Sequence, residues 1–211
     1  MDNQEYLTRI RAIIGDDAEP RGYFEGHLPR FLAQLDMWRE FLDKEKIDVV
    51  LDLGTKVPFT SLYFHLTQDA IVTFGCVGLP YTELNDKVAG IDVNLNRPTR
   101  FPAVDLVICT ECLEHLPSNL YKVRAYLCEC VKDGKFLLLS FPLGRKNACN
   151  YQDDLPQDHE KPHDHLREFT EQTARDFYIG TGFKLVSERI TFTEAYGGNI
   201  MNVLLQKDIV A

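Results

Sequence analysis

The spacing of apolar residues along the chain predicts an α/β domain. Phe31, Leu35, Trp38 and Leu42 recur at steps of four, three and four, which places them on one face of a helix. Helical patterns of this kind alternate with short apolar runs, so we predict a mainly parallel sheet with helices on both faces. The apolar runs that are typical of buried strands are residues 48–54, 70–77, 104–110 and 135–142.

The last third of the chain predicts a helix and then an antiparallel hairpin. Thr170 is a suitable cap for a helix that runs to Tyr178. Residues 183–191 and 199–208 have strand patterns and only a short connection between them. Farther upstream, Ser118 is expected to cap a helix that follows the 104–110 strand. We therefore expect an antiparallel C-terminal hairpin at one edge of the sheet.

The carboxyl ends of the parallel strands are the expected place for a ligand. Gly54 directly follows the first strand and lets a ligand approach the backbone closely. A dinucleotide-binding loop would continue with further glycines, whereas Lys56 and Pro58 stand here. By spacing alone, a simple strand-to-helix turn explains Gly54 at least as well as a cofactor loop does.

Composition and charge narrow the class of protein. The 211 residues carry a formal net charge of -9, which argues against partners that are nucleic acids or anionic membrane surfaces. No apolar run approaches the roughly 20 residues of a membrane span. The polar N-terminus does not resemble a signal peptide, and six cysteines are too few for a disulfide scaffold. We expect a cytoplasmic protein with reduced thiols.

A motif that begins with the apolar run at 104–110 carries a family resemblance. The stretch "VDLVICTECLEHL", residues 104–116, has the pattern D-x-V-x-x-x-E-x-L-E-H-L. Together with "VVLDLG" upstream and "HDHLREFTEQTARDFYIGTGFKLV" downstream, it resembles the class I methyltransferases that use S-adenosylmethionine, in their small-molecule branch. The resemblance extends from about Asp48 to Asp208 and implies a seven-stranded Rossmann-like domain at 47–211. Residues 1–46 would form a helical segment that covers the acceptor side.

The resemblance also implies a cofactor and its contacts. Asp52, Gly54 and Thr55 would lie around the methionine part of S-adenosylmethionine, and Asp92 would contact the adenine. The wall beneath the sulfonium would come from three consecutive residues, Cys109, Thr110 and Glu111. The implied activity is methyl transfer to oxygen or nitrogen of a small molecule, such as a sugar, or of a glycan precursor.

An alternative interpretation starts from the departures from this family pattern. Lys56 and Pro58 stand where the family usually has glycines, and Cys76 stands where a carboxylate normally holds the ribose hydroxyls. A thiol cannot accept two charge-assisted hydrogen bonds. These positions favour a methyltransferase-like scaffold with a degenerate cofactor site that acts as a binding protein.

Histidines supply the candidate catalytic groups. An alcohol or amine acceptor must lose a proton, and His115, His163 and His165 follow strand ends that can converge on one cleft. His159 and the last two histidines have a spacing that a metal could use, but polar loops often contain histidine, so we expect no metal site. The cysteines at 109 and 112 do not predict zinc, because the first belongs to a buried strand.

The segment before the first predicted helix combines aromatic and basic residues. A strip of this kind would suit an anionic or sugar-like acceptor, although a surface turn is the simpler interpretation. Its members are Arg21, Tyr23, Phe24, His27 and Arg30.

Overall fold

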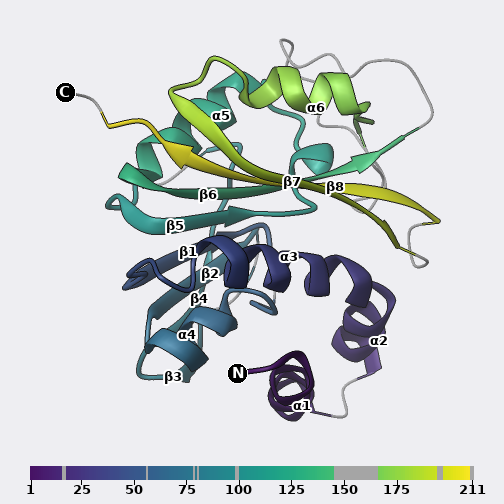
Figure 1. Cartoon of the computed structure of the whole chain (residues 1–211), viewed down its shortest axis with the longest axis vertical. Helices are drawn as coiled ribbons and strands as arrows, with labels where there is room; N and C mark the ends of the chain where they lie inside the picture. The colour runs from purple at the N-terminus through teal and green to yellow at the C-terminus, as the bar shows by residue number, and fades with distance from the viewer. Residues whose placement is uncertain are drawn as a thin grey trace.

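One eight-stranded sheet organises the chain, with strand order β3-β4-β2-β1-β5-β6-β8-β7 (Figure 1). The computed structural model describes residues 1–15, 18–55, 57–77, 79, 81–97, 100–144, 166–193 and 197–209. The strands are β1 (Val49–Leu53), β2 (Ile71–Cys76), β3 (Thr82–Asn85), β4 (Val88–Asp92), β5 (Val104–Cys109), β6 (Val131–Leu143), β7 (Phe183–Thr193) and β8 (Gly198–Lys207). The helices are α1 (Asn3–Ile14), α2 (Ala18–Gly26), α3 (Leu28–Phe41), α4 (Leu62–Gln68), α5 (Leu120–Cys130) and α6 (Glu171–Tyr178), with a short 3₁₀ helix η1 (Leu113–His115).

The strand directions confirm the predicted α/β fold. β4, β2, β1, β5 and β6 run parallel, whereas β8 is antiparallel to both β6 and β7. The strand beyond the predicted seven is β3, which pairs with β4 as an antiparallel hairpin. Three of its four residues are polar and its single leucine, Leu84, is exposed, so no apolar pattern marks them as a strand. The C-terminal hairpin β7–β8 is confirmed.

Two hydrophobic cores lie on opposite faces of the sheet (Figure 1). The first core packs helices α1, α2, α3 and α4 against the sheet. It contains Trp38 of α3 and Phe64 of α4, whose ring centroids lie 4.7 Å apart. The second core joins α5 and α6 to the other face, where Phe141 packs edge-on against Phe177. The four apolar residues predicted to share one face of α3 are all buried in the first core. Among the described residues, no helix is long and apolar enough to cross a membrane.

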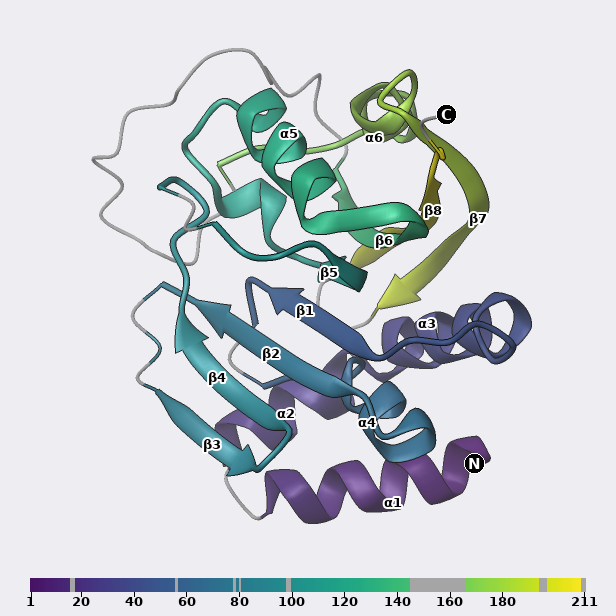
Figure 2. The same ribbon diagram turned by 90° about the vertical axis from the view of Figure 1, so that its left-hand side faces the viewer.

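The N-terminal helices cover a part of the sheet that lacks a crossover helix. β2 and β4 are parallel neighbours, but the described residues between them contain β3 rather than a helix. Val72 and Phe74 of β2 belong to the same cluster as Tyr6 and Ile10 of α1 and Phe24 of α2. Figure 2 shows α2 behind β2 and β4, with α1 along the lower edge. The predicted boundary at residue 46 remains a prediction, although the segment before it packs as part of the main fold.

Two helix caps show how local chemistry sets the element ends. Thr170 caps α6 as predicted, because its side chain accepts a hydrogen bond from the Thr173 N–H at 3.1 Å. The cap predicted for α5 is wrong by one residue. Asn119 accepts from the Tyr121 N–H, whereas the Ser118 hydroxyl donates to Asn96 Oδ1 at 2.6 Å and is not available.

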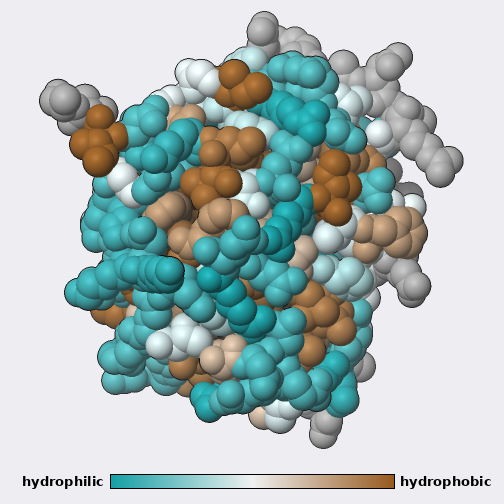
Figure 3. Space-filling view, in the orientation of Figure 1, coloured by the Kyte–Doolittle hydropathy of each residue, from teal (hydrophilic) through white to brown (hydrophobic). Residues whose placement is uncertain are grey.

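The surface is chemically mixed. On the face of Figure 3, apolar side chains form separate groups between hydrophilic ones. The edge strand β7 exposes Leu185 and Phe192, but two of its charged residues are anchored to helices. Glu188 pairs with Arg175 of α6, and Arg189 pairs with Glu40 of α3. Charged pairs on an edge strand disfavour pairing with another strand.

Asp105 joins the beginnings of three central strands. Its Oδ2 accepts the backbone N–H groups of Asp48 and Val49 at 3.0 Å, and its Oδ1 accepts from Lys132 Nζ at 2.8 Å. Burial alone would raise the pKa of Asp105, but these hydrogen bonds and the charge of Lys132 outweigh burial and lower the pKa. The ionised form is therefore the one that stabilises the folded state.

We predict that Asp105→Asn lowers the free energy of unfolding at pH 7 by about 1–2 kcal/mol, because charge-assisted hydrogen bonds are lost. A carboxyl whose pKa is depressed on folding contributes stability above its ordinary pKa of 3.8, and loses it as pH falls through the lower folded value. Denaturant unfolding at several pH values should thus show that the difference in unfolding free energy between wild type and Asp105→Asn becomes smaller only below about pH 3.8.

Asp133→Asn is the matched control, since Asp133 pairs with Lys207 at the surface and is about half exposed. Its effect should stay below about 1 kcal/mol. Equal stability of wild type and Asp105→Asn at pH 7 would contradict this assignment.

Candidate functional site

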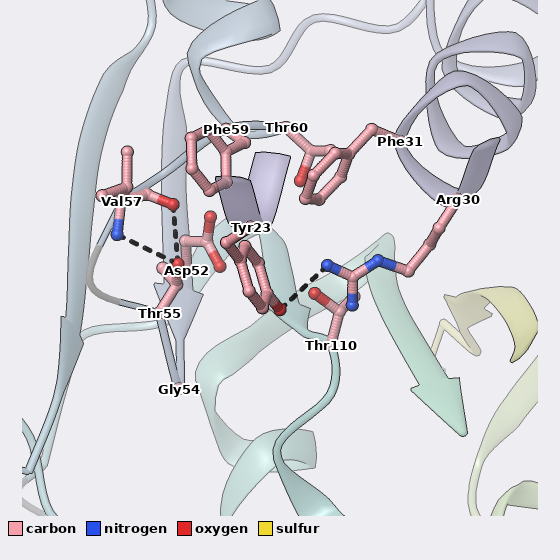
Figure 4. Close-up of a pocket in the computed structure, with 10 residues that line it drawn as sticks. All are labelled: Tyr23, Arg30, Phe31, Asp52, Gly54, Thr55, Val57, Phe59, Thr60 and Thr110. Atoms are coloured by element: carbon pink, nitrogen blue, oxygen red, sulfur yellow. Dashed lines mark hydrogen bonds between the residues drawn. The ribbon is translucent and has the colours of Figure 1, made fainter. Parts of the chain in front are cut away.

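A small pocket lies at the carboxyl ends of β1 and β5 and is partly open to solvent (Figure 4). The N-terminal helices α2 and α3 supply one wall, and the β1–α4 connection supplies another. This position is the one that the parallel sheet predicts for a ligand. The residues that line the pocket are Tyr23, Arg30, Phe31, Asp52, Gly54, Thr55, Val57, Phe59, Thr60 and Thr110.

Gly54 is needed at its position for two independent reasons. Its φ is +88°, a left-handed conformation that disfavours any side chain. A Cβ on Gly54 would also lie 2.5 Å from the Sγ of Cys112, far inside van der Waals contact. The close approach expected at this glycine is therefore made in part by the β5–α5 loop, while Gly54 still lines the pocket.

Asp52 lies buried at the pocket wall with an unusual pKa. Its Oδ2 accepts from the Ser61 hydroxyl at 2.7 Å. Burial raises the pKa of Asp52 to about 7, although the Ser61 hydrogen bond and the positive charge of Arg30 oppose the shift. Both protonation states of Asp52 are thus accessible near neutral pH. In the adjacent turn, the Thr55 hydroxyl donates to the Val57 carbonyl at 2.7 Å, which fixes the loop backbone.

Arg30 brings a positive charge into the pocket from the start of α3. Only 2% of its surface is exposed. One guanidinium nitrogen, Nη2, donates to the Tyr23 hydroxyl at 3.2 Å, and the guanidinium lies 4.6 Å from the ring centre of Phe31. In Figure 4 it points toward Tyr23 and Thr110. Tyr23 and Arg30 belong to the aromatic and basic strip seen in the sequence, and the structure places both in the pocket.

Two glutamates of the β5–α5 loop lie close behind the pocket. Glu111 has a φ of +51°, held by a reciprocal pair of hydrogen bonds in which its N–H donates to Ser140 Oγ and Ser140 Oγ donates to its carboxylate. The Glu111 carboxylate lies 3.7 Å from the Arg30 guanidinium. Glu114 is fully buried, and burial followed by the charge of Glu111 raises its pKa well above the ordinary value.

The pocket brings together four of the seven residues expected to bind the cofactor: Asp52, Gly54, Thr55 and Thr110. Glu111 reaches the pocket indirectly, through Arg30. Cys109 is fully buried at the end of β5, where hydrogen bonding to Cys112 and burial raise the pKa of its thiol. Asp92 lies apart, at the exposed end of β4, directly beside Cys76 of β2 in the sheet register.

The structure describes only one of the three candidate catalytic histidines. His115 ends η1, is one third exposed, and lies 3.5 Å from the Glu114 carboxylate. His163 and His165 lie outside the described residues, as does the histidine at 159 considered for a metal. Among the described residues, no group of three or more histidine, cysteine or acidic side chains is arranged to hold a metal ion.

Several pocket residues are not evident from the sequence. The spacing of apolar residues assigns Phe31 only to the core, yet it also faces the pocket beneath Arg30. Phe59 and Thr60 have a pattern that suits a helix, but they lie in the turn before α4 and line the pocket.

Solved structures share this architecture. One is the 1,6-didemethyltoxoflavin N1-methyltransferase from Burkholderia thailandensis, which was crystallised with S-adenosylhomocysteine. The match covers 99% of this chain and 92% of the methyltransferase chain, with a TM-score of 0.65 and 16% sequence identity. The N-methyltransferase NodS from Bradyrhizobium japonicum, also with S-adenosylhomocysteine, matches 98% and 99% at TM-score 0.62 and 12% identity. The fold is that of the class I methyltransferases.

The same methyltransferase fold also serves other chemistry. The [4+2]-cyclase SpnF matches 85% of this chain and 81% of its own at TM-score 0.60 and 11% identity. Fold alone therefore does not determine the reaction. No protein-family model and no curated protein matches the sequence.

Gly54→Ala tests the close contact beneath the pocket. We predict a loss of about 2–4 kcal/mol in unfolding free energy, the sum of left-handed strain and the clash with Cys112. Gly180→Ala is the matched control, because Gly180 has a φ of +72° and a Cβ added there would meet nothing within 4 Å. It should lose only about 1 kcal/mol in chemical denaturation. Equal losses in the two variants would show that the contact with Cys112 is not tight.

The raised pKa of Asp52 makes a prediction about pH. The folded pKa of about 7 lies above the ordinary value of 3.8, so the folded state binds the proton more tightly than the unfolded chain. The free energy of unfolding should fall as pH rises between these values, by at most about 1.4 kcal/mol per pH unit. Asp52→Asn should lack this part of the pH dependence of the unfolding free energy. Parallel pH profiles of wild type and Asp52→Asn would contradict the raised pKa.

Proposed function

We propose that the protein is a methyltransferase that uses S-adenosylmethionine to methylate oxygen or nitrogen of a small molecule or a glycan precursor. The pocket carries this proposal, because it combines Gly54, Asp52 and Thr110 at the carboxyl ends of β1 and β5. Proteins of the same fold have been crystallised with S-adenosylhomocysteine bound. The unused hydrogen-bonding atoms of buried Arg30 also fit a charged ligand.

The residues around the pocket suit the methionine part of the cofactor. Asp52 and the loop at Gly54 and Thr55 would hold it, and Thr110 would line the side toward the acceptor. When bound, the cofactor supplies an electrophilic methyl group on a sulfonium. The residues of this chain would orient the acceptor toward that group and provide a base for the acceptor proton. Holding the nucleophile near attack distance supplies much of the acceleration.

His115 is our candidate for the base in that step. It ends η1, the short helix that follows β5, and its Nε2 lies 3.5 Å from the Glu114 carboxyl group. A neutral imidazole in this position can take the proton that the acceptor loses. His163 and His165 remain candidates from the sequence alone.

A carboxylate for the ribose can come from an unexpected strand. The end of β2 bears Cys76 where the family has an acid, but Asp92 of β4 is its direct partner in the sheet. We propose that Asp92 accepts the hydrogen bonds of the ribose hydroxyls, in place of the adenine contact implied by the sequence resemblance. One carboxylate in this position can accept two hydrogen bonds.

A second candidate function is a binding protein built on the same scaffold. Cys76 at the ribose position and the packing of Cys112 against Gly54 favour this alternative, because both differ from an open cofactor loop. The two candidates differ in whether the pocket binds the cofactor.

Calorimetry with S-adenosylhomocysteine tests the proposal. We expect wild-type protein to bind with a dissociation constant in the micromolar range, which corresponds to a binding free energy on the order of −8 kcal/mol. Asp92→Asn should weaken binding about 10-fold, because a charge-assisted hydrogen bond is lost. Glu83→Gln is the matched control, since Glu83 lies on the neighbouring edge strand β3 and is exposed.

Absence of binding at millimolar ligand would overturn the methyltransferase proposal and favour the binding protein. Tight binding that Asp92→Asn leaves unchanged would remove only the ribose assignment.

A further inference from the structure

The guanidinium of Arg30 has hydrogen-bonding capacity that the described part of the chain does not use. Its Nη2 group donates to Tyr23, but Nε and Nη1 are buried without a hydrogen-bond partner among the described residues. A buried donor without a partner costs free energy, typically about 1–3 kcal/mol. The side chain is 2% exposed and lines the pocket, so a ligand in the pocket can reach it.

The carboxylates around Arg30 do not satisfy it directly. Glu111 is 3.7 Å from Nη1, beyond hydrogen-bond distance, and its carboxylate already accepts from Ser140. Asp52 accepts from Ser61, and Glu114 has no hydrogen-bond partner for its carboxyl oxygens among the described residues. These groups lower the electrostatic cost of a buried guanidinium but leave its donors free.

The neighbouring groups select the kind of ligand that fits. A guanidinium donates two parallel hydrogen bonds to the two oxygens of a carboxylate. Tyr23 and Thr110 place hydroxyl groups at the same pocket. A phosphate dianion fits poorly, because Asp52 and Glu111 already place acidic groups around the site. His27 adds no positive charge, since burial and the charge of Arg30 lower its pKa to about 4.

We propose that Arg30, with the hydroxyl of Tyr23, forms a carboxylate-binding subsite built by the N-terminal helices. The carboxylate can belong to the amino-acid end of the cofactor or to the acceptor. If the carboxylate belongs to the cofactor, the subsite rests on the proposed function. If it belongs to the acceptor, Arg30 need not contact the cofactor. Either way, Arg30 determines which ligands the pocket accepts.

The first arm of the test compares S-adenosylhomocysteine with 5′-methylthioadenosine, which lacks the amino-acid end. If Arg30 holds the cofactor carboxylate, Arg30→Gln should weaken binding of S-adenosylhomocysteine by roughly 10- to 100-fold. Binding of 5′-methylthioadenosine should not change. Arg30→Lys keeps the charge but loses the planar fork, so it should fall between wild type and Arg30→Gln.

The second arm uses sodium benzoate as a simple carboxylate, added to protein saturated with S-adenosylhomocysteine. If Arg30 faces the acceptor, benzoate should bind wild type and not Arg30→Gln, and the affinity for S-adenosylhomocysteine should be equal in both proteins. If neither ligand distinguishes wild type from Arg30→Gln, the subsite does not exist.

Two controls keep the outcomes separate. Arg9→Gln removes an exposed arginine of α1 and should leave both ligands unaffected, which excludes an effect of net charge. Thermal unfolding of each variant identifies loss of fold, in which case Arg30→Lys decides the outcome. If wild type binds neither nucleoside, the proposed function fails, and benzoate binding to the free protein alone then decides whether the carboxylate subsite stands.

Discussion

A buried positive charge at the carboxyl ends of the strands is the constraint that shapes this site. Arg30 comes from the N-terminal helices, whereas the acidic groups near it, Asp52, Glu111 and Glu114, come from the sheet and its loops. Buried ion pairs contribute little net stability, because the loss of hydration offsets the attraction. Packing therefore does not explain why a charge is held here with two donors that lack a partner among the described residues. The proposed carboxylate subsite would explain it.

The same N-terminal helices also explain how the sheet is covered. The connection between β2 and β4 forms the β3 hairpin where it is described, so α1 and α2 supply the apolar cover on that face. Tyr6 and Phe24 are fully buried there. The segment that completes the core thus also forms a wall of the pocket through Tyr23. Changes in these helices that weaken the core are expected to disturb ligand binding as well.

The features that local patterns determine are predictable from the sequence. The face of α3, the cap at Thr170 and the C-terminal hairpin follow from spacing and hydrogen-bonding chemistry. β3 escapes detection because a polar edge strand has no apolar period, and the α5 cap moves because Ser118 bonds to Asn96, a distant residue. The pocket is predictable in part, since strand ends can be located from the sequence. The pairing of Arg30 with the β5 loop is a tertiary contact between distant segments, and no local pattern marks it.

The decisive experiment is a crystal structure of the protein with S-adenosylhomocysteine. We predict that the homocysteine end lies between Gly54 and Thr110, with its carboxylate or that of a second ligand on the guanidinium of Arg30. A ligand bound elsewhere, with the Nε and Nη1 groups of Arg30 still without a partner, would refute the role assigned to this arginine.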